Sequence, residues 1–151
     1  MYELKVITRF AAAHRLAMVG ERCENLHGHN WKIEVTIAGE ELDPAGVLLD
    51  FGVLKERVRG IVERLDHRFL NDLEPFAADR QPSSERIAAF IARELEGTLT
   101  EPGLRVSRVS AWESEDACAT FLPPAAAGGL KPRRRPGARQ ARASARKAPR
   151  A

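Results

Sequence analysis

The order of secondary-structure patterns along the chain predicts an α+β fold with a mainly antiparallel sheet. Two alternating strand patterns come first, two helical patterns follow, and two further strands end the patterned region, giving the order β-β-α-α-β-β. Hairpins that are segregated from helices favour antiparallel pairing, because parallel strands need long crossover connections. The chain has 151 residues, of which 44% are apolar and 30% are charged, a composition typical of one globular domain.

The two N-terminal strands are predicted from the parity of their apolar side chains. In residues 4–14 Leu4, Val6, Phe10 and Ala12 fall on even positions with Thr8 between, and His14 continues that parity. In residues 30–38 the apolar side chains from Ile33 to Ile37 alternate with polar ones. Successive side chains of a strand point to opposite faces, so both runs predict strands with one buried face.

Two helices are expected next, each with a capping residue and an apolar stripe. Asp50 suits the N-cap of the first helix. Pro82-Ser83-Ser84-Glu85 opens the second, where Glu85 in the first turn suits the helix dipole and Gly97 is the expected end. The stripes at helical spacing are Leu54, Val58, Ile61 and Leu65 in the first helix and Ile87, Phe90, Ile91 and Leu95 in the second.

The last two strands are expected at residues 104–113 and 117–122, joined by the polar turn Ser114-Glu115-Asp116. Glu113 ends the first of these strands. Cys118 lies inside the second strand, and we interpret it as a small buried apolar residue.

The net charge of +3 conceals two parts of opposite sign. Residues 131–151 contain nine of the 24 Lys and Arg and none of the 21 Asp and Glu, a local charge of +9, so residues 1–130 carry a net charge of −6. The basic stretch has no hydrophobic residue larger than Ala, which predicts disorder. We therefore expect a folded domain over residues 1–122 and a Pro/Gly linker with a disordered basic tail over residues 123–151. Nucleic acid binding by the tail stays open, but a solvated extension is the favoured interpretation.

Composition also bears on the cellular compartment. No apolar run approaches the roughly 18 residues of a membrane span, so no membrane association is expected. The first ten residues carry charge and lack the apolar region of a secretory signal. Two cysteines are too few for a disulfide framework, which favours a reducing compartment and predicts a cytoplasmic location.

The histidines are the first candidates for a functional site. Four occur in the chain, and two of them form the motif His27-Gly28-His29. On an extended backbone the two imidazoles of such a motif point to one face. His14, at the end of a strand with a consistent inward face, is a candidate third ligand. Three neutral imidazoles with an open fourth position form the ligand set of a catalytic zinc ion, and histidines that only pack or hydrogen-bond are the alternative.

Other residues permit proton chemistry, and each has a plainer alternative. Cys23 lies four residues before His27, and a thiol near a metal or an imidazole can ionise and act as a base or nucleophile, whereas most cysteines are simply buried. Asp66 can orient His67 and raise its basicity, although such pairs also cap helix ends. Glu113 can bind a guanidine-like edge through two parallel hydrogen bonds, although strand-end glutamates are usually only solvated.

Six separate motifs occur in collinear order within residues 1–122, and the basic tail contains none of them. They are Phe10-x3-His14-Arg15-Leu16, Cys23-x3-His27-Gly28-His29, Leu49-Asp50-Phe51, Leu65-Asp66-His67 with Leu70-Asn71, Pro82-Ser83-Ser84-Glu85, and Glu113. This pattern resembles the 6-pyruvoyltetrahydropterin synthase superfamily.

The resemblance implies the tunnelling fold (T-fold), a four-stranded antiparallel sheet with two helices packed on one face. In this superfamily the sheets of several subunits join into a barrel. The usual assembly is a homohexamer of two stacked trimers with active sites at subunit interfaces, so a homo-oligomer of this kind is the expected partner arrangement.

The resemblance also implies a role for each metal-site residue. His14, His27 and His29 would hold a zinc ion (Zn2+), and Cys23 would be the catalytic base. Animal 6-pyruvoyltetrahydropterin synthases place five residues between this cysteine and the next histidine, whereas bacterial 6-carboxytetrahydropterin synthases place three. This chain has three, as in the bacterial enzymes. A folate-pathway branch of the superfamily works with a glutamate in place of the cysteine. Glu24 adjoins Cys23, but the presence of the cysteine disfavours that branch.

The remaining implied roles concern proton transfer and substrate binding. Asp66 and His67 would complete a Cys–Asp–His relay, contributed across a subunit interface. Glu113 would anchor the pterin ring, and Ser83 and Ser84 would help where the family more often has threonine.

The implied activity is that of a lyase. The substrate would be 7,8-dihydroneopterin triphosphate, and the zinc-dependent reaction would give 6-carboxy-5,6,7,8-tetrahydropterin with release of acetaldehyde and triphosphate, in the biosynthesis of queuosine and other 7-deazapurines. Two alternatives stay open. One is a 6-pyruvoyltetrahydropterin synthase, a phosphate-lyase on the same fold, and the other is a non-catalytic module that binds zinc and a pterin or a partner.

Overall fold

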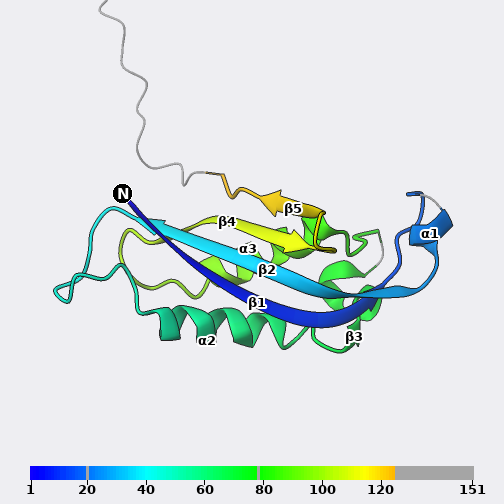
Figure 1. Cartoon of the computed structure of the whole chain (residues 1–151), viewed down its shortest axis with the longest axis horizontal. Coiled ribbons are helices and arrows are strands. Elements are labelled where there is room, and N and C mark those ends of the chain that lie inside the picture. The colour runs from blue at the N-terminus through cyan, green and yellow to red at the C-terminus, as the bar shows by residue number, and fades with distance from the viewer. Residues whose placement is uncertain (20, 78, 125–151) are drawn as a thin grey trace, which may run out of the picture.

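A computed structural model describes residues 1–19, 21–77 and 79–124, in which two long helices pack against one twisted sheet (Figure 1). The sheet has five strands in the order β3-β1-β2-β4-β5. The elements in chain order are β1 (Tyr2–His14), α1 (Glu21–Glu24), β2 (His27–Gly39), α2 (Phe51–Val62), β3 (Arg68–Phe69), the 3-10 helices η1 (Leu70–Asp72) and η2 (Glu74–Phe76), α3 (Ser84–Glu96), β4 (Arg105–Trp112) and β5 (Cys118–Phe121).

The expected sheet of four antiparallel strands is corrected in one respect. Strands β1, β2, β4 and β5 pair antiparallel, as expected, but β3 adds a fifth strand that runs parallel to β1. The pairing involves only Ala12 with Arg68 and Ala13 with Phe69. A two-residue strand is too short to produce an alternating pattern, so the sequence carried no signal for it. The sheet is therefore mixed.

The β1–β2 hairpin holds the longest stretch of the core. Both strands have 13 residues, and their register pairs Val6 with Val35 and Phe10 with Trp31, so the buried side chains of the two strands share one face. Helices α2 and α3 cover that face, and one continuous cluster of buried side chains joins them to the sheet. The opposite face of the sheet carries polar pairs such as Lys5 with Glu34, whose side chains are 3.1 Å apart.

Both predicted helices are present with the expected caps. The Asp50 carboxylate accepts a hydrogen bond from the Val53 amide at 3.1 Å, and the Ser83 hydroxyl accepts one from the Arg86 amide at 3.4 Å. Gly97 follows the last residue of α3, as predicted. Helix α2 ends at Val62, earlier than the apolar stripe indicated, so Asp66 and His67 lie in the turn that leads to β3 rather than at the helix end.

Cys118 is exposed, so its interpretation as a buried apolar residue is wrong. Strand β5 has only four residues and lies at the edge of the sheet. Cys118 pairs with Trp112, and Ala119 pairs with the buried Ala111. Because successive side chains of a strand point to opposite faces, the Cys118 side chain lies on the face of the sheet that the helices do not cover.

Within the described residues, no helix is long and apolar enough to cross a bilayer. Of the predicted linker and basic tail, only residues 123 and 124 belong to the described part of the chain, and residues 125–151 lie outside it.

Candidate metal centre

Three histidines meet at the end of the β1–β2 hairpin where residues 15–26 connect the two strands. The register pairs His14 with His27 and Ala12 with His29, so all three imidazoles project from the helix-covered face. Their ring centroids lie 4.6 Å apart for His14 and His27, 5.1 Å for His14 and His29, and 4.9 Å for His27 and His29. Trp31, one residue pair further into the hairpin, contacts the rings of His14 and His29 edge-on and forms the floor of the cluster.

Backbone carbonyl groups orient two of these imidazoles. His14 Nδ1 lies 2.8 Å from the Pro82 carbonyl oxygen, and His27 Nδ1 lies 2.7 Å from the Asn25 carbonyl oxygen. A carbonyl oxygen only accepts hydrogen bonds, so each Nδ1 carries the hydrogen and donates it. In the neutral imidazole the lone pair then lies on Nε2, the tautomer that a metal ion requires at that atom.

Burial disfavours the charged form of His14 and of His29. His14 is 0% exposed, and burial lowers its pKa below the ordinary value, against an opposing effect of the Pro82 carbonyl. Burial likewise lowers the pKa of His29, although the nearby Glu113 carboxylate opposes it. His14 Nε2 is buried and has no hydrogen-bond partner. An unpartnered buried lone pair is costly in a folded protein unless something binds it.

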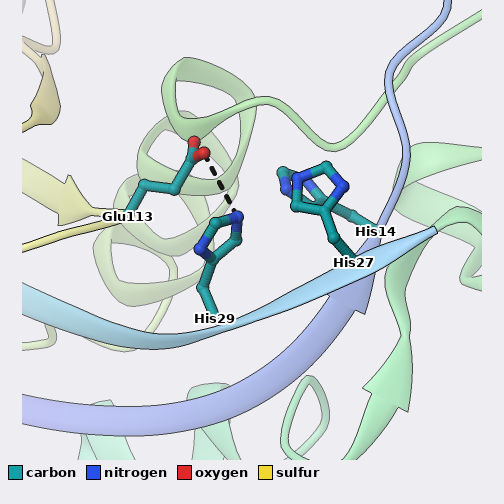
Figure 2. Close-up of side chains that lie close together, drawn as sticks. All are labelled: His14, His27, His29 and Glu113. Atoms are coloured by element: carbon teal, nitrogen blue, oxygen red, sulfur yellow. Dashed lines mark ion pairs between the residues drawn. The ribbon is translucent and has the colours of Figure 1, made fainter. Parts of the chain in front are cut away.

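Glu113 completes the cluster from the strand next to β2 in the sheet. It follows β4 directly, and its Oε1 lies 3.2 Å from His29 Nε2. The Ser84 hydroxyl, in the first turn of α3, donates to Glu113 Oε2 at 3.0 Å. Figure 2 shows the carboxylate and the three imidazoles facing a common space.

The four side chains fit a divalent metal ion. One ligand atom from each of His14, His27, His29 and Glu113 lies within 4.8 Å of every other. Zinc bound at about 2.0–2.1 Å separates neighbouring ligands by roughly 3.3 Å, which the His29–Glu113 distance of 3.2 Å already matches. Neutral imidazoles with one carboxylate are a common zinc donor set, and His14 Nε2 supplies the buried lone pair that a bound ion would occupy.

Cys23 lies in α1, within the connection from His14 to His27. Cys23 is half-buried, and its backbone carbonyl oxygen accepts a hydrogen bond from the Leu16 amide at 2.7 Å. It does not belong to the group of metal-ligand atoms found among the described residues. The structure therefore places the thiol on the segment that joins two histidines of the cluster.

Asp66 and His67 form a pair that is tied to β1. The Asp66 carboxylate accepts the Ala11 amide at 2.9 Å, and its second oxygen lies 2.9 Å from His67 Nδ1. The Ala11 hydrogen bond, followed by the one from His67, lowers the pKa of Asp66, so it stays ionised. The His67 side chain is 82% exposed, and its φ of 55° turns the chain sharply at this residue.

The structure thus divides the predicted site residues into two groups. His14, His27, His29, Glu113 and Ser84 lie together, whereas the Asp66–His67 pair opens to solvent. A cavity of about 500 Å³ is lined by residues 11–13 of β1, 28–30 of β2 and 67–69, so His67 and His29 line the same cavity. Cys23 does not line this cavity. Ser83 contributes its hydroxyl to the cap of α3.

Comparison with known proteins adds the family. A family model described as 6-pyruvoyl tetrahydropterin synthase matches residues 3–124. The chain belongs to this family. It is 35% identical over 102 residues to the 6-carboxy-5,6,7,8-tetrahydropterin synthase of Bacillus subtilis, an alignment that covers 65% of the chain and 68% of that relative. It is 37% identical over 108 residues to the dihydroneopterin monophosphate aldolase of Pyrococcus furiosus, covering 71% and 85%.

A solved structure supports the fold independently. The 6-pyruvoyl tetrahydropterin synthase of Caenorhabditis elegans is similar with a TM-score of 0.70 and 26% sequence identity, over 82% of the chain and 96% of that structure. The family match also explains why the sequence motifs are collinear over the first 122 residues. Sequence reasoning missed the carbonyl groups of Pro82 and Asn25, because any residue has a carbonyl and only the fold reveals which one reaches a histidine.

Proposed function

We propose that the protein is a zinc-dependent 6-carboxy-5,6,7,8-tetrahydropterin synthase. It would convert 7,8-dihydroneopterin triphosphate, with uptake of water, to 6-carboxy-5,6,7,8-tetrahydropterin, acetaldehyde and triphosphate, as a step toward queuosine or another 7-deazapurine. The observation that carries the proposal is the three-histidine cluster with a cysteine on its connecting segment, in a chain of this family. The relative in Bacillus subtilis has this activity in its name.

Each side chain of the cluster has a definite task in this reaction. His14, His27 and His29 would hold the ion, and zinc, when bound, supplies a Lewis acid that polarises the hydroxyl groups of the substrate side chain. The Cys23 thiolate would remove a proton from the reacting carbons. His67 would exchange a proton with the substrate or the thiol, and the Asp66 carboxylate, 2.9 Å from His67 Nδ1, would orient its ring.

Glu113 is suited to hold the pterin ring. The amidine-like edge of a pterin presents two parallel N–H groups, and a carboxylate accepts both in a bidentate pair. The Ser84 hydroxyl donates to Glu113 Oε2 at 3.0 Å and so restricts rotation of the carboxylate before the ring binds. Binding then costs less side-chain entropy. The same carboxylate lies beside His29, so the ring would bind with its reacting side chain next to the metal site.

A homohexamer of two trimers would complete the active site. Within the described residues, no contact joins Cys23 to Asp66 or His67, and His67 points into solvent. Residues 2–10 of β1 pair with β2 on one edge only, so the other edge of that strand is available to a neighbouring sheet. An exposed imidazole and an open strand edge are the features expected of a site shared between subunits.

Two other activities in this family have a specific observation in their favour. The Caenorhabditis elegans structure favours the pyruvoyl-forming phosphate-lyase, and the Pyrococcus furiosus relative favours an aldolase acting on dihydroneopterin monophosphate. The Cys23-x3-His27 spacing supports the carboxytetrahydropterin synthase over the animal-type enzyme. The Glu24 carboxylate, a candidate base in place of Cys23, accepts the Met18 amide at 3.0 Å and is engaged within its own loop.

Product identification tests the proposal. The zinc-loaded, full-length protein is incubated with 7,8-dihydroneopterin triphosphate, and the products are identified by mass spectrometry together with an acetaldehyde assay. We expect 6-carboxytetrahydropterin and acetaldehyde in equal amounts. Accumulation of 6-pyruvoyltetrahydropterin without acetaldehyde would assign the phosphate-lyase instead. In a parallel incubation with 7,8-dihydroneopterin monophosphate, formation of glycolaldehyde phosphate and 6-hydroxymethyl-7,8-dihydropterin would assign the aldolase. Binding without turnover would assign a non-catalytic module.

A further inference from the structure

Two side-chain amides hold the backbone that follows His14. The Asn71 amide accepts the Arg15 N–H at 3.0 Å and donates to the Arg15 carbonyl oxygen at 3.0 Å. The Gln81 amide accepts the Ala17 N–H and donates to the Ala17 carbonyl oxygen at 3.3 Å. Each amide therefore satisfies both backbone groups of one residue, as a neighbouring strand would. We call Asn71 and Gln81 the amide clamp.

The clamp extends to the backbone of Cys23. Between the two clamped residues, the Leu16 amide donates to the Cys23 carbonyl oxygen at 2.7 Å. This hydrogen bond joins the clamped backbone directly to the residue that carries the thiol, and a second one, from the Met18 amide to the Glu24 carboxylate at 3.0 Å, also joins the segment after β1 to helix α1. Movement of residues 15–17 would consequently move Cys23.

The clamp arises from the same two segments that position His14. Asn71 follows β3, whose residues pair with Ala12 and Ala13, so the amide continues this edge of the sheet beyond the last strand pair. Gln81 precedes Pro82, whose carbonyl holds His14 Nδ1. After the β1–β2 ladder ends at His14, the clamp thus holds the backbone groups of Arg15 and Ala17 in place of a neighbouring strand.

We infer that Asn71 and Gln81 are positioning residues that fix Cys23 relative to the histidine cluster. The catalytic role of Cys23 in this inference rests on the proposed function. The hydrogen bonds of the clamp do not depend on that role. Both amides are partly exposed and lie outside the hydrophobic core, so their removal should alter the placement of the loop more than the stability of the fold. Misplacement of a reacting group by about 1 Å can lower turnover about a hundredfold.

The test compares three variants in a Cys118→Ser background, which removes the exposed second thiol. Asn71→Ala removes both hydrogen bonds to Arg15, Asn71→Asp retains the acceptor for the Arg15 N–H, and Asp72→Ala is a matched control at the exposed neighbouring residue of η1. The first measurement is the rate at which iodoacetamide alkylates Cys23 in the zinc-loaded protein. We expect Asn71→Ala to react about tenfold faster because its loop opens more often, Asn71→Asp to be intermediate, and Asp72→Ala to match the parent.

The second measurement is a double-mutant cycle on turnover. Asn71→Ala should lower kcat about a hundredfold with KM changed less than about twofold, and zinc content should be unchanged. In a Cys23→Ala background the same substitution should have no further effect, because its effect passes through Cys23. A Gln81→Ala variant should repeat both results.

Two outcomes overturn the inference. Unchanged alkylation of Cys23 in Asn71→Ala and Gln81→Ala means that the amides do not position the thiol. An equal loss of turnover with and without Cys23, or loss of zinc, means that they act through His14 or through the fold. If Asn71→Ala does not fold, Asn71→Asp and Gln81→Glu provide the same comparison. If the parent has no pterin lyase activity, the proposed function fails while the alkylation rates still decide the role of the clamp.

Discussion

His14 combines complete burial with a lone pair that nothing in the described structure satisfies. Its Nδ1 donates to Pro82, its ring contacts Trp31, and its Nε2 faces the other two imidazoles. Leaving a buried acceptor unsatisfied costs about 1–3 kcal/mol, a cost that a bound metal ion removes. The buried histidine cluster is therefore better explained as a set of metal ligands than as side chains that only pack in the core.

Metal content separates the ligands from the substrate-binding carboxylate. We expect His14→Ala to lose at least about 90% of its zinc after dialysis, because two imidazoles do not retain the ion, whereas Glu113→Gln should keep it while losing turnover. The measurement is zinc per chain by mass spectrometry of the metal, with Cys118→Ser as the control. Loss of zinc from Glu113→Gln equal to that from His14→Ala would make the carboxylate a metal ligand.

The histidine cluster was predictable from the sequence because its signal is local. Parity along residues 4–14 placed His14 on the buried face, and the His27-Gly28-His29 motif placed two imidazoles on one face of a strand. The register that sets His14 opposite His27 is a tertiary property, and so is the approach of Glu113 from another strand. Neither has a local signal, so neither followed from the residues alone.

At the scale of elements, the long periodic segments and the four-residue strand β5 were predicted, whereas four other short elements were missed. Strand β2 begins at His27 rather than residue 30, because the polar motif at its start has no apolar alternation. Strand β3 and helices α1, η1 and η2 have two to four residues each, too few for a repeating pattern. These short elements carry Cys23 and Asn71, so the functional loops were the least predictable part of the fold.

An ion pair joins α2 to the turn before β4 and gives a pH-dependent contribution to stability. Arg57 donates to both Glu101 carboxylate oxygens, at 2.9 Å and 2.7 Å. The Arg57 hydrogen bonds lower the pKa of Glu101 from 4.5 to about 2. A carboxyl group with a depressed folded-state pKa stabilises the fold above its unfolded pKa, and this stability is lost as the pH falls through the folded pKa.

Glu101→Gln should therefore lower the free energy of unfolding by about 1 kcal/mol near neutral pH, a value reduced for the partial exposure of the pair. The difference from wild type should shrink as the pH falls from 4.5, the ordinary pKa of this carboxyl group, to about 2, its pKa in the folded state. Urea unfolding at a series of pH values measures this, with Glu63→Gln, in an exposed pair on α2, as the control. A difference that stayed constant with pH would contradict the assignment to this ion pair.

At the scale of the whole molecule, one face of the sheet and the outer edge of β1 over residues 2–10 are not covered by any of the described elements. The helices cover a single face, and residues 2–10 of β1 have a strand partner on one side only among the residues described. The Asp66–His67 pair lies beside that open edge, anchored through Ala11. A neighbouring subunit at this edge would bring its own Cys23 or histidine cluster toward His67.

A site shared between subunits predicts complementation between two inactive variants. Cys23→Ala and His67→Asn should each be nearly inactive alone, but subunits mixed by denaturation and refolding should regain activity. An interface between the two variants can pair an intact Cys23 with an intact His67. If equal amounts of the two variants assort at random in a closed ring, about one quarter of the sites receive both intact residues. Separately refolded variants combined without denaturation are the control and should stay inactive. No recovery in mixed oligomers, verified by mass spectrometry, would place Cys23 and His67 of each site on the same chain.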